Sequence, residues 1–215
     1  FLNELFLSTD PKVQNLQWIL GSLQKSTRKF IDPSKFIYEW NGGWNNQTVD
    51  PKVEQDAFEF YNFIMNDCPE NAKEIFKGEQ IINLKGDDNF SKEIVEPFFS
   101  ISVNVKGFSN LNQSINSLIE PETIQDYDDG NGNKISVSRL MKITQCPKIL
   151  VIQLNRFEYN RELNSNIKIN DLFEFPEHLN ILPLLHEEKN AFYSLHSIVC
   201  HYGSAQGNGH YYTLI

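Results

Sequence analysis

A histidine near the end of the chain has the surroundings of a group that does chemistry. The stretch GNGHYYTLI, residues 207–215, places His210 between small residues and two tyrosines. Glycine lets a backbone or a bound molecule approach closely, so a substrate could come near this imidazole. Tyr211, Tyr212 and the aliphatic residues after them are of types enriched in strands. The stretch therefore predicts an approachable histidine on a strand.

The three cysteines, Cys68, Cys146 and Cys200, are the other candidates for chemistry. An odd number without short intervals indicates neither a disulfide framework nor a zinc cluster. Cys68 follows a predicted helix, Cys146 precedes Pro147, and Cys200 lies inside a predicted strand. Each is predicted to be a reduced, small hydrophobic residue, and neither a metal nor a cofactor is expected.

Charge excludes two classes of partner. The 215 residues contain 28 acidic and 19 basic side chains, and the formal net charge is −9. A binder of nucleic acid or of an anionic membrane would present a basic face. No apolar run reaches the roughly 20 residues of a membrane helix, and no signal peptide is visible. We expect a soluble monomeric domain that is intracellular, cytoplasmic or nuclear, without nucleic-acid or membrane partners.

The elements that must position these residues fall into two kinds. Apolar residues recur at helical spacing up to about residue 66, which predicts short helices joined by polar turns. One helix is predicted to begin at Asp50-Pro51 and to stop at 67–69. Further along, residues 111–121 predict another helix, and DYDDGNGN, residues 126–133, predicts a hairpin tip or loop. Strands are predicted at 78–84, 97–107, 134–143, 148–159, 192–203 and 209–215.

Four segments in this order resemble the ubiquitin-specific protease family, the papain-like cysteine peptidases that remove ubiquitin. They correspond to the family patterns Q-Q-D-A-x-E-F, L-P-x-x-L-x-x-x-L-x-R-F, K-x-x-x-x-x-x-F-P and Y-x-L-x-A-V-x-x-H-x-G-x-x-x-x-G-H-Y. The segments are EQDAFEF (54–60), CPKILVIQLNRFEYN (146–160), IKINDLFEFP (167–176) and YSLHSIVCHYGSAQGNGHYYTLI (193–215).

The resemblance implies an α+β fold of the papain-like cysteine peptidase type. Residues 1–215 would form a single catalytic domain, with a helical thumb at 1–70, a β finger lobe at 71–145 and a β palm at 146–215. Many family members carry two C-x-x-C pairs that bind zinc in the fingers. This sequence has neither pair, so we expect a finger lobe without metal.

The resemblance also implies roles for individual residues. His210 would be the general base that takes the proton of a nucleophilic cysteine. Asp56 would accept hydrogen bonds from the basic tail of ubiquitin, while His201, Gly209 and Tyr211 would line the channel for that tail. Two plainer interpretations stay open, a solvated acidic helix face for Asp56 and a core histidine for His201. Core packing is predicted for Phe58, Phe60 and Phe63.

Two parts of the family pattern are missing. The nucleophile lies in a box resembling G-N-T-C-Y-x-N-S-x-L-Q-x-L-F, and aligning LNELF with its end puts the cysteine about five residues before Phe1. An Asp or Asn that orients the histidine is expected some fifteen to twenty residues after His210. The sequence thus resembles a catalytic domain trimmed at both ends, and we expect the piece alone to be inactive.

The leading hypothesis is a deubiquitinating cysteine peptidase that acts on ubiquitin and ubiquitinated proteins. One alternative is a catalytically inactive ubiquitin-binding pseudoenzyme or scaffold, whose upstream box has lost its cysteine. Another is a papain-like peptidase for other substrates or for a ubiquitin-like modifier, which would keep His210 and change the contacts near Asp56.

Overall fold

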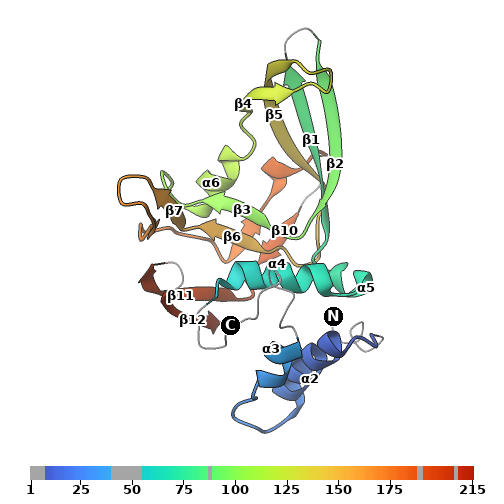
Figure 1. Ribbon diagram of the computed structural model, residues 1–215, viewed down its shortest axis with the longest axis vertical. Helices are drawn as coiled ribbons and strands as arrows, with labels where there is room; N and C mark the ends of the chain where they lie inside the picture. Colours follow the sequence, from blue (N-terminus) through green and yellow to red (C-terminus); the bar gives the residue numbers. More distant parts are fainter. Residues whose placement is uncertain (1–7, 40–54, 87–88, 188–190, 206–207) are drawn as a thin grey trace. The chain divides into compact units, whose positions relative to one another are not determined.

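The computed structural model describes residues 8–39, 55–86, 89–187, 191–205 and 208–215 (Figure 1). Two compact units make up the chain. One comprises Phe1–Ile75 with Cys200–Tyr212, and the other comprises Phe76–Val199 with Thr213–Ile215. In the described part of the chain, the first unit contains four helices and most of the last strand pair, whereas strands dominate the second. This confirms the predicted α+β class. Among the described residues, no helix is long and apolar enough to cross a membrane.

The helices of the first unit pack around a small apolar cluster. They are α2 (Pro11–Lys25), α3 (Ser34–Glu39), α4 (Ala57–Asp67) and α5 (Glu70–Lys73). The Asp10 carboxylate caps α2 by accepting from the Lys12 amide at 2.8 Å. The Lys12 ammonium also contacts the Asp67 carboxylate at 3.1 Å, which links the start of α2 to the end of α4. The buried members of the cluster are Val13, Leu16, Phe36, Cys68 and Ala72.

Helix α4 begins later than the sequence predicts. The predicted start, Asp50-Pro51, lies outside the described residues, but Gln55 and Asp56 are described and are not helical. The helix starts at Ala57 because the Asp56 carboxylate accepts hydrogen bonds from the first free amides of the helix. The predicted end is confirmed, since α4 stops at Asp67 with Cys68 as its C-cap.

A four-stranded antiparallel sheet is the largest element of the second unit. Its strand order is β2 (Ser91–Phe98), β1 (Gly78–Gly86), β5 (Lys134–Gln145) and β4 (Glu122–Asp128), and Figure 1 shows these strands side by side. Alternate residues of β1 face the core, so Ile82 and Leu84 are buried. The hairpin tip predicted at 126–133 is confirmed for residues 129–133, which join β4 to β5, whereas residues 126–128 are the end of β4.

Shorter strand pairs complete the second unit. The strand predicted over 148–159 is divided at Arg156, whose amide donates to the Leu154 carbonyl, so that its two halves pair with different partners. The first half is parallel to β3, and the second half forms a hairpin. The pairs are β3 (Ile101–Asn104) with β6 (Ile152–Asn155), β7 (Phe157–Asn160) with β8 (Ser165–Lys168), and β9 (His178–Asn180) with β10 (Phe192–Ser194).

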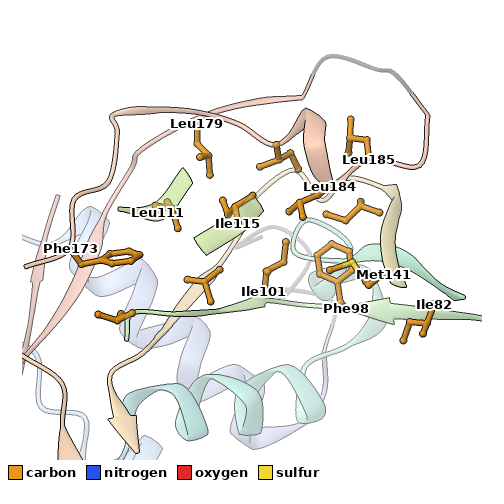
Figure 2. Close-up of a cluster of buried hydrophobic side chains, with 14 of the residues drawn as sticks. Ile82, Phe98, Ile101, Leu111, Ile115, Met141, Phe173, Leu179, Leu184 and Leu185 are labelled. Atoms are coloured by element: carbon orange, nitrogen blue, oxygen red, sulfur yellow. The ribbon is translucent and has the colours of Figure 1, made fainter. Parts of the chain in front are cut away.

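The hydrophobic core of this unit lies between the sheet and two short helices. Figure 2 shows Leu111 and Ile115 of α6 (Leu111–Ser117) among the same side chains as Leu184, at the end of the 3-10 helix η1 (Leu182–Leu184). Helix α6 is also held by its buried Ser114, whose hydroxyl donates to the Asn104 carbonyl at 2.7 Å. The core thus joins β3 to the four-stranded sheet.

Candidate active site

The predicted histidines lie on one strand pair, β11 (Ile198–Ala205) with β12 (Asn208–Leu214). The rings of His201 and Tyr211 are 4.8 Å apart between centroids and are inclined by 49°. Cys200 lies close enough to Tyr212 for its thiol to raise the pKa of the Tyr212 hydroxyl. Consecutive residues of β11 therefore meet residues of β12 in reverse order, as in an antiparallel hairpin.

Strand alternation sorts these residues onto two faces. Successive side chains of a strand point to opposite faces, so His201, Gly209 and Tyr211 share one face. His210 projects from the other face, together with Cys200 and Tyr212. The His210 side chain is exposed. The predicted base is thus accessible. On the same face, hydrogen bonding with the Cys200 thiol raises the pKa of Tyr212.

The space beside Gly209 is filled by a side chain of the protein. A methyl group at Gly209 would come within 2.5 Å of Nε2 and 3.0 Å of Cε1 of His201, and even closer to the backbone oxygen of Tyr202. The sequence suggests that this glycine leaves room for a substrate. In the structure, that room holds the imidazole ring of His201.

Asp56 has a structural role that sequence reasoning missed. The side chain is half-buried, and Oδ1 accepts from the amides of Phe58 at 2.8 Å and Glu59 at 2.9 Å. Asp56 is therefore the N-cap of α4 as well as a predicted ligand for ubiquitin. The signal was present, because an acidic residue three positions after a capping residue, here Glu59, is typical of a helix start.

The three phenylalanines of α4 differ in their surroundings. Phe60 and Phe63 pack against the cluster of the first unit, as predicted, and Phe60 meets Phe36 edge to face at 6.0 Å. Phe58 instead stacks on Tyr61, with ring centroids 6.0 Å apart and planes inclined by 17°. Burial raises the pKa of Tyr61 to about 12.

Two of the cysteines have the properties of structural residues. Cys68 is buried, and its burial raises the pKa of the thiol to about 11. Burial also raises the pKa of Cys146, although a hydrogen bond with Tyr193 opposes this effect. A thiol with a raised pKa is a poor nucleophile near neutral pH. Within the described ranges, no group of three or more His, Cys, Asp or Glu side chains could hold a metal ion.

Arg156 joins two of the four motif segments. Its Nη1 atom donates to the backbone carbonyls of Ile169 and Asp171, each at 3.1 Å. The Ile169 amide in turn donates to the Arg156 carbonyl at 2.6 Å. A guanidinium can serve two acceptors from one rigid fork, which explains why an arginine suits this position.

The comparisons of this chain with known proteins agree on one family. The family model described as ubiquitin carboxyl-terminal hydrolase matches residues 4–215. Ubiquitin carboxyl-terminal hydrolase 7 of Drosophila melanogaster is 30% identical over 188 residues, which cover 80% of this chain and 16% of the relative. Ubiquitin carboxyl-terminal hydrolase 15 of Schizosaccharomyces pombe is 31% identical over 226 residues, which cover 97% and 19%. The chain thus spans less than two thirds of the length of these relatives.

Solved structures share the fold. One is the SAGA DUB module of Ubp8, Sgf11, Sus1 and Sgf73 bound to ubiquitin aldehyde, with a TM-score of 0.71 and 26% identity over 96% of this chain. Another is the same kind of module bound to monoubiquitin, with a TM-score of 0.73 and 25% identity. The match covers 52% and 51% of those chains, respectively. These matches confirm the fold that the four motif segments imply.

Proposed function

The chain belongs to the ubiquitin carboxyl-terminal hydrolase family, and from that premise we propose that the protein is a deubiquitinating, thiol-dependent hydrolase. It would cleave the bond after the C-terminal glycine of ubiquitin in ubiquitinated proteins. The observation that carries the proposal is His210, an exposed imidazole on a paired strand inside the region that matches the family. The ubiquitin named in the related structures supports the choice of substrate.

His210 acts as the general base in the proposed reaction. It takes the proton of a cysteine thiol, and the thiolate attacks the carbonyl carbon of the last glycine of ubiquitin. A carbon–sulfur bond forms and the carbon–nitrogen bond breaks, while the imidazolium returns its proton to the leaving amine. Water then hydrolyses the thioester and releases the ubiquitin carboxylate and the free thiol.

The remaining parts of the catalytic centre are assigned to chain outside residues 1–215. Alignment with the family box puts the nucleophile about five residues before Phe1. The raised thiol pKa values of Cys68 and Cys146 support this assignment, because neither thiol is suited to attack. An Asp or Asn after Ile215 would orient the His210 ring.

Asp56 is proposed to bind the basic tail of ubiquitin with its second carboxylate oxygen. Both capping hydrogen bonds use Oδ1, and they fix the direction in which Oδ2 points. A carboxylate held in this way forms a charge-assisted bond to arginine without having to be ordered first. The cap thus serves recognition as well as stability.

His201, Gly209 and Tyr211 are proposed to form part of the wall of the tail channel. Their common face on the hairpin supports a shared role. Because the imidazole of His201 covers the Cβ side of Gly209, the tail would meet the His201 and Tyr211 rings on that side.

The test is the intact mass of the full-length protein after incubation with ubiquitin that carries a C-terminal thiol-reactive group. We expect a covalent ubiquitin adduct, strongly reduced by His210→Ala. His196→Ala is the matched control, because His196 is exposed and lies in the loop between β10 and β11. An unmodified protein that still binds ubiquitin in a titration would indicate the pseudoenzyme. Absence of both the adduct and binding would overturn the assignment to ubiquitin.

A further inference from the structure

We propose that His201 has a second role as a positioning residue, whose ring fixes strand β12 and through it the imidazole of His210. The inference rests on the proposed function, because it takes His210 as the general base. It depends on three features of the hairpin: the face that each histidine occupies, the fit of the His201 ring beside Gly209, and its contact with Tyr211.

The two histidines cannot act on each other directly through their side chains. His201 shares its face with Tyr211, and residues 201 and 211 meet across the hairpin. His210 is adjacent to Tyr211 on β12, so its side chain projects from the opposite face. Any influence of His201 on His210 must therefore pass through the backbone of β12.

The ring of His201 is seated where β12 has no side chain. A Cβ at Gly209 would lie 2.5 Å from Nε2 of His201 and even closer to the backbone oxygen of Tyr202, so only glycine admits both the ring and the neighbouring backbone at this place. Gly209 is not among the residues with a left-handed backbone, unlike Gly107, Gly130 and Gly132. The reason for a glycine at 209 is therefore space for a neighbour and not backbone conformation.

The ring of His201 makes a second contact, with the residue that follows His210 in the sequence. Tyr211 approaches the imidazole with a centroid separation of 4.8 Å, within the range of favourable aromatic pairs. The ring of His201 thus touches the residue before His210 and the residue after it. Packing on both neighbours fixes the direction in which the peptide between them projects the His210 side chain.

The catalytic consequence follows from the sensitivity of proton transfer to geometry. Misplacement of a catalytic group by about 1 Å can lower a rate by roughly 100-fold. A correctly placed imidazolium lowers the pKa of its partner thiol, and a displaced one has a weaker effect, so the thiolate then forms only at higher pH. A residue that only binds the ubiquitin tail changes KM and leaves the ionisation of the nucleophile unchanged.

The experiment compares His201→Ala with His201→Phe in the full-length protein. Iodoacetamide alkylates the nucleophilic cysteine without help from ubiquitin, and peptide mapping follows that cysteine separately from the others. We expect His201→Ala to lower kcat on a fluorogenic ubiquitin amide by roughly 10- to 100-fold. We also expect it to raise the alkylation midpoint, which is the pH at which the alkylation rate of the nucleophilic cysteine is half-maximal. His201→Phe keeps an aromatic ring, so its alkylation midpoint should equal that of the wild-type protein, even if its KM differs.

Control variants separate positioning from unfolding. His196→Ala should leave kcat and the alkylation midpoint unchanged. If His201→Ala fails to fold by circular dichroism, Tyr211→Leu removes the ring contact while keeping apolar bulk, and it should produce the same upward shift of the midpoint.

Two results would overturn the inference. One is a His201→Ala protein with a raised KM and an unchanged alkylation midpoint, and the other is a His201→Phe protein that behaves as His201→Ala. Failure of the proposed function looks different, because the wild type itself would then form no adduct with the reactive ubiquitin.

Discussion

The hydroxyl group of Tyr193 donates a hydrogen bond to the backbone carbonyl oxygen of Pro147 at 2.6 Å. This bond connects β10 to the chain just before β6, and so joins two of the segments by which the family is recognised. Burial, with a smaller contribution from Cys146, raises the pKa of Tyr193. The phenol therefore remains a hydrogen-bond donor over the whole physiological range.

Replacing Tyr193 by Phe should destabilise the protein by about 1 kcal/mol, because a half-buried carbonyl loses its donor. Urea unfolding followed by circular dichroism measures the change. Tyr38→Phe is the control, since Tyr38 is 63% exposed, and its unfolding midpoint should not move. Equal midpoints for Tyr193→Phe and wild type would show that the hydrogen bond adds no net stability.

Replacing Asp56 by Asn or Ala should separate its two roles. Asparagine caps helices as well as aspartate, so Asp56→Asn should keep the thermal stability, whereas Asp56→Ala should cost roughly 1 kcal/mol. Both variants remove the charge, and we expect both to weaken ubiquitin binding in a titration.

A cap without a proposed binding role provides the comparison for Asp56. The carboxylate of Asp10 caps α2 in the same way, so Asp10→Ala should lower stability and leave ubiquitin affinity unchanged. Full affinity in Asp56→Asn would refute the assignment of Oδ2 to the ubiquitin tail.

Stability should fall in alkaline solution because of Cys68. Burial raises the pKa of its thiol to about 11 from an ordinary value of 9.0. The unfolded chain thus loses this proton first, so the stabilising effect is complete below pH 9 and is lost as the pH rises through 11. In Cys68→Ala, the free energy of unfolding should depend less steeply on pH between these values. The slopes are compared, since removing the buried sulfur also lowers stability at every pH.

The tip between β4 and β5 should loosen when Asp129 is replaced. Its Oδ1 atom accepts from the amides of Asn131 at 2.7 Å and Asn133 at 3.1 Å. These bonds, and the Asn133 side-chain amide above all, lower the pKa of Asp129, so the turn should hold above the ordinary value of 3.8 and weaken as the pH falls. Amide hydrogen exchange at both asparagines should be faster in Asp129→Ala at pH 7. Asp129→Asn keeps one oxygen acceptor and should give intermediate rates.

Elements with a strong periodic pattern could be predicted from the sequence. Strands β1 and β5 carry buried apolar residues two positions apart, such as Ile82 and Leu84 on β1 and Met141 and Ile143 on β5. Helix α6 presents Leu111 and Ile115 to the core. The edge strands β2 and β4 were missed. Half of the residues in SKEIVEPF and most of those in ETIQDYD are polar, and most side chains of both strands are exposed, since an edge strand with one neighbour buries fewer side chains.

Contacts between distant parts of the chain could not be predicted. The division of one predicted strand at Arg156 depends on its pairing with β3, a partner far away in sequence whose Ile101 lies opposite Ile152. At the candidate site, the sequence indicates His210 and the glycine before it. It does not indicate that the ring of His201 fills the space beside Gly209, because that depends on how two strands pair.

The central position of β1 has a consequence for the nascent chain. Its first partner, β2, follows within the same hairpin, whereas its second, β5, is delivered much later: Glu79 contacts Thr144, which is 65 residues away in sequence. At a synthesis rate of about 5–20 residues per second, one edge of β1 stays unpaired for several seconds after it leaves the ribosome. An open edge of this kind can pair with other chains. We expect chaperones to engage the protein during this interval, before β5 emerges.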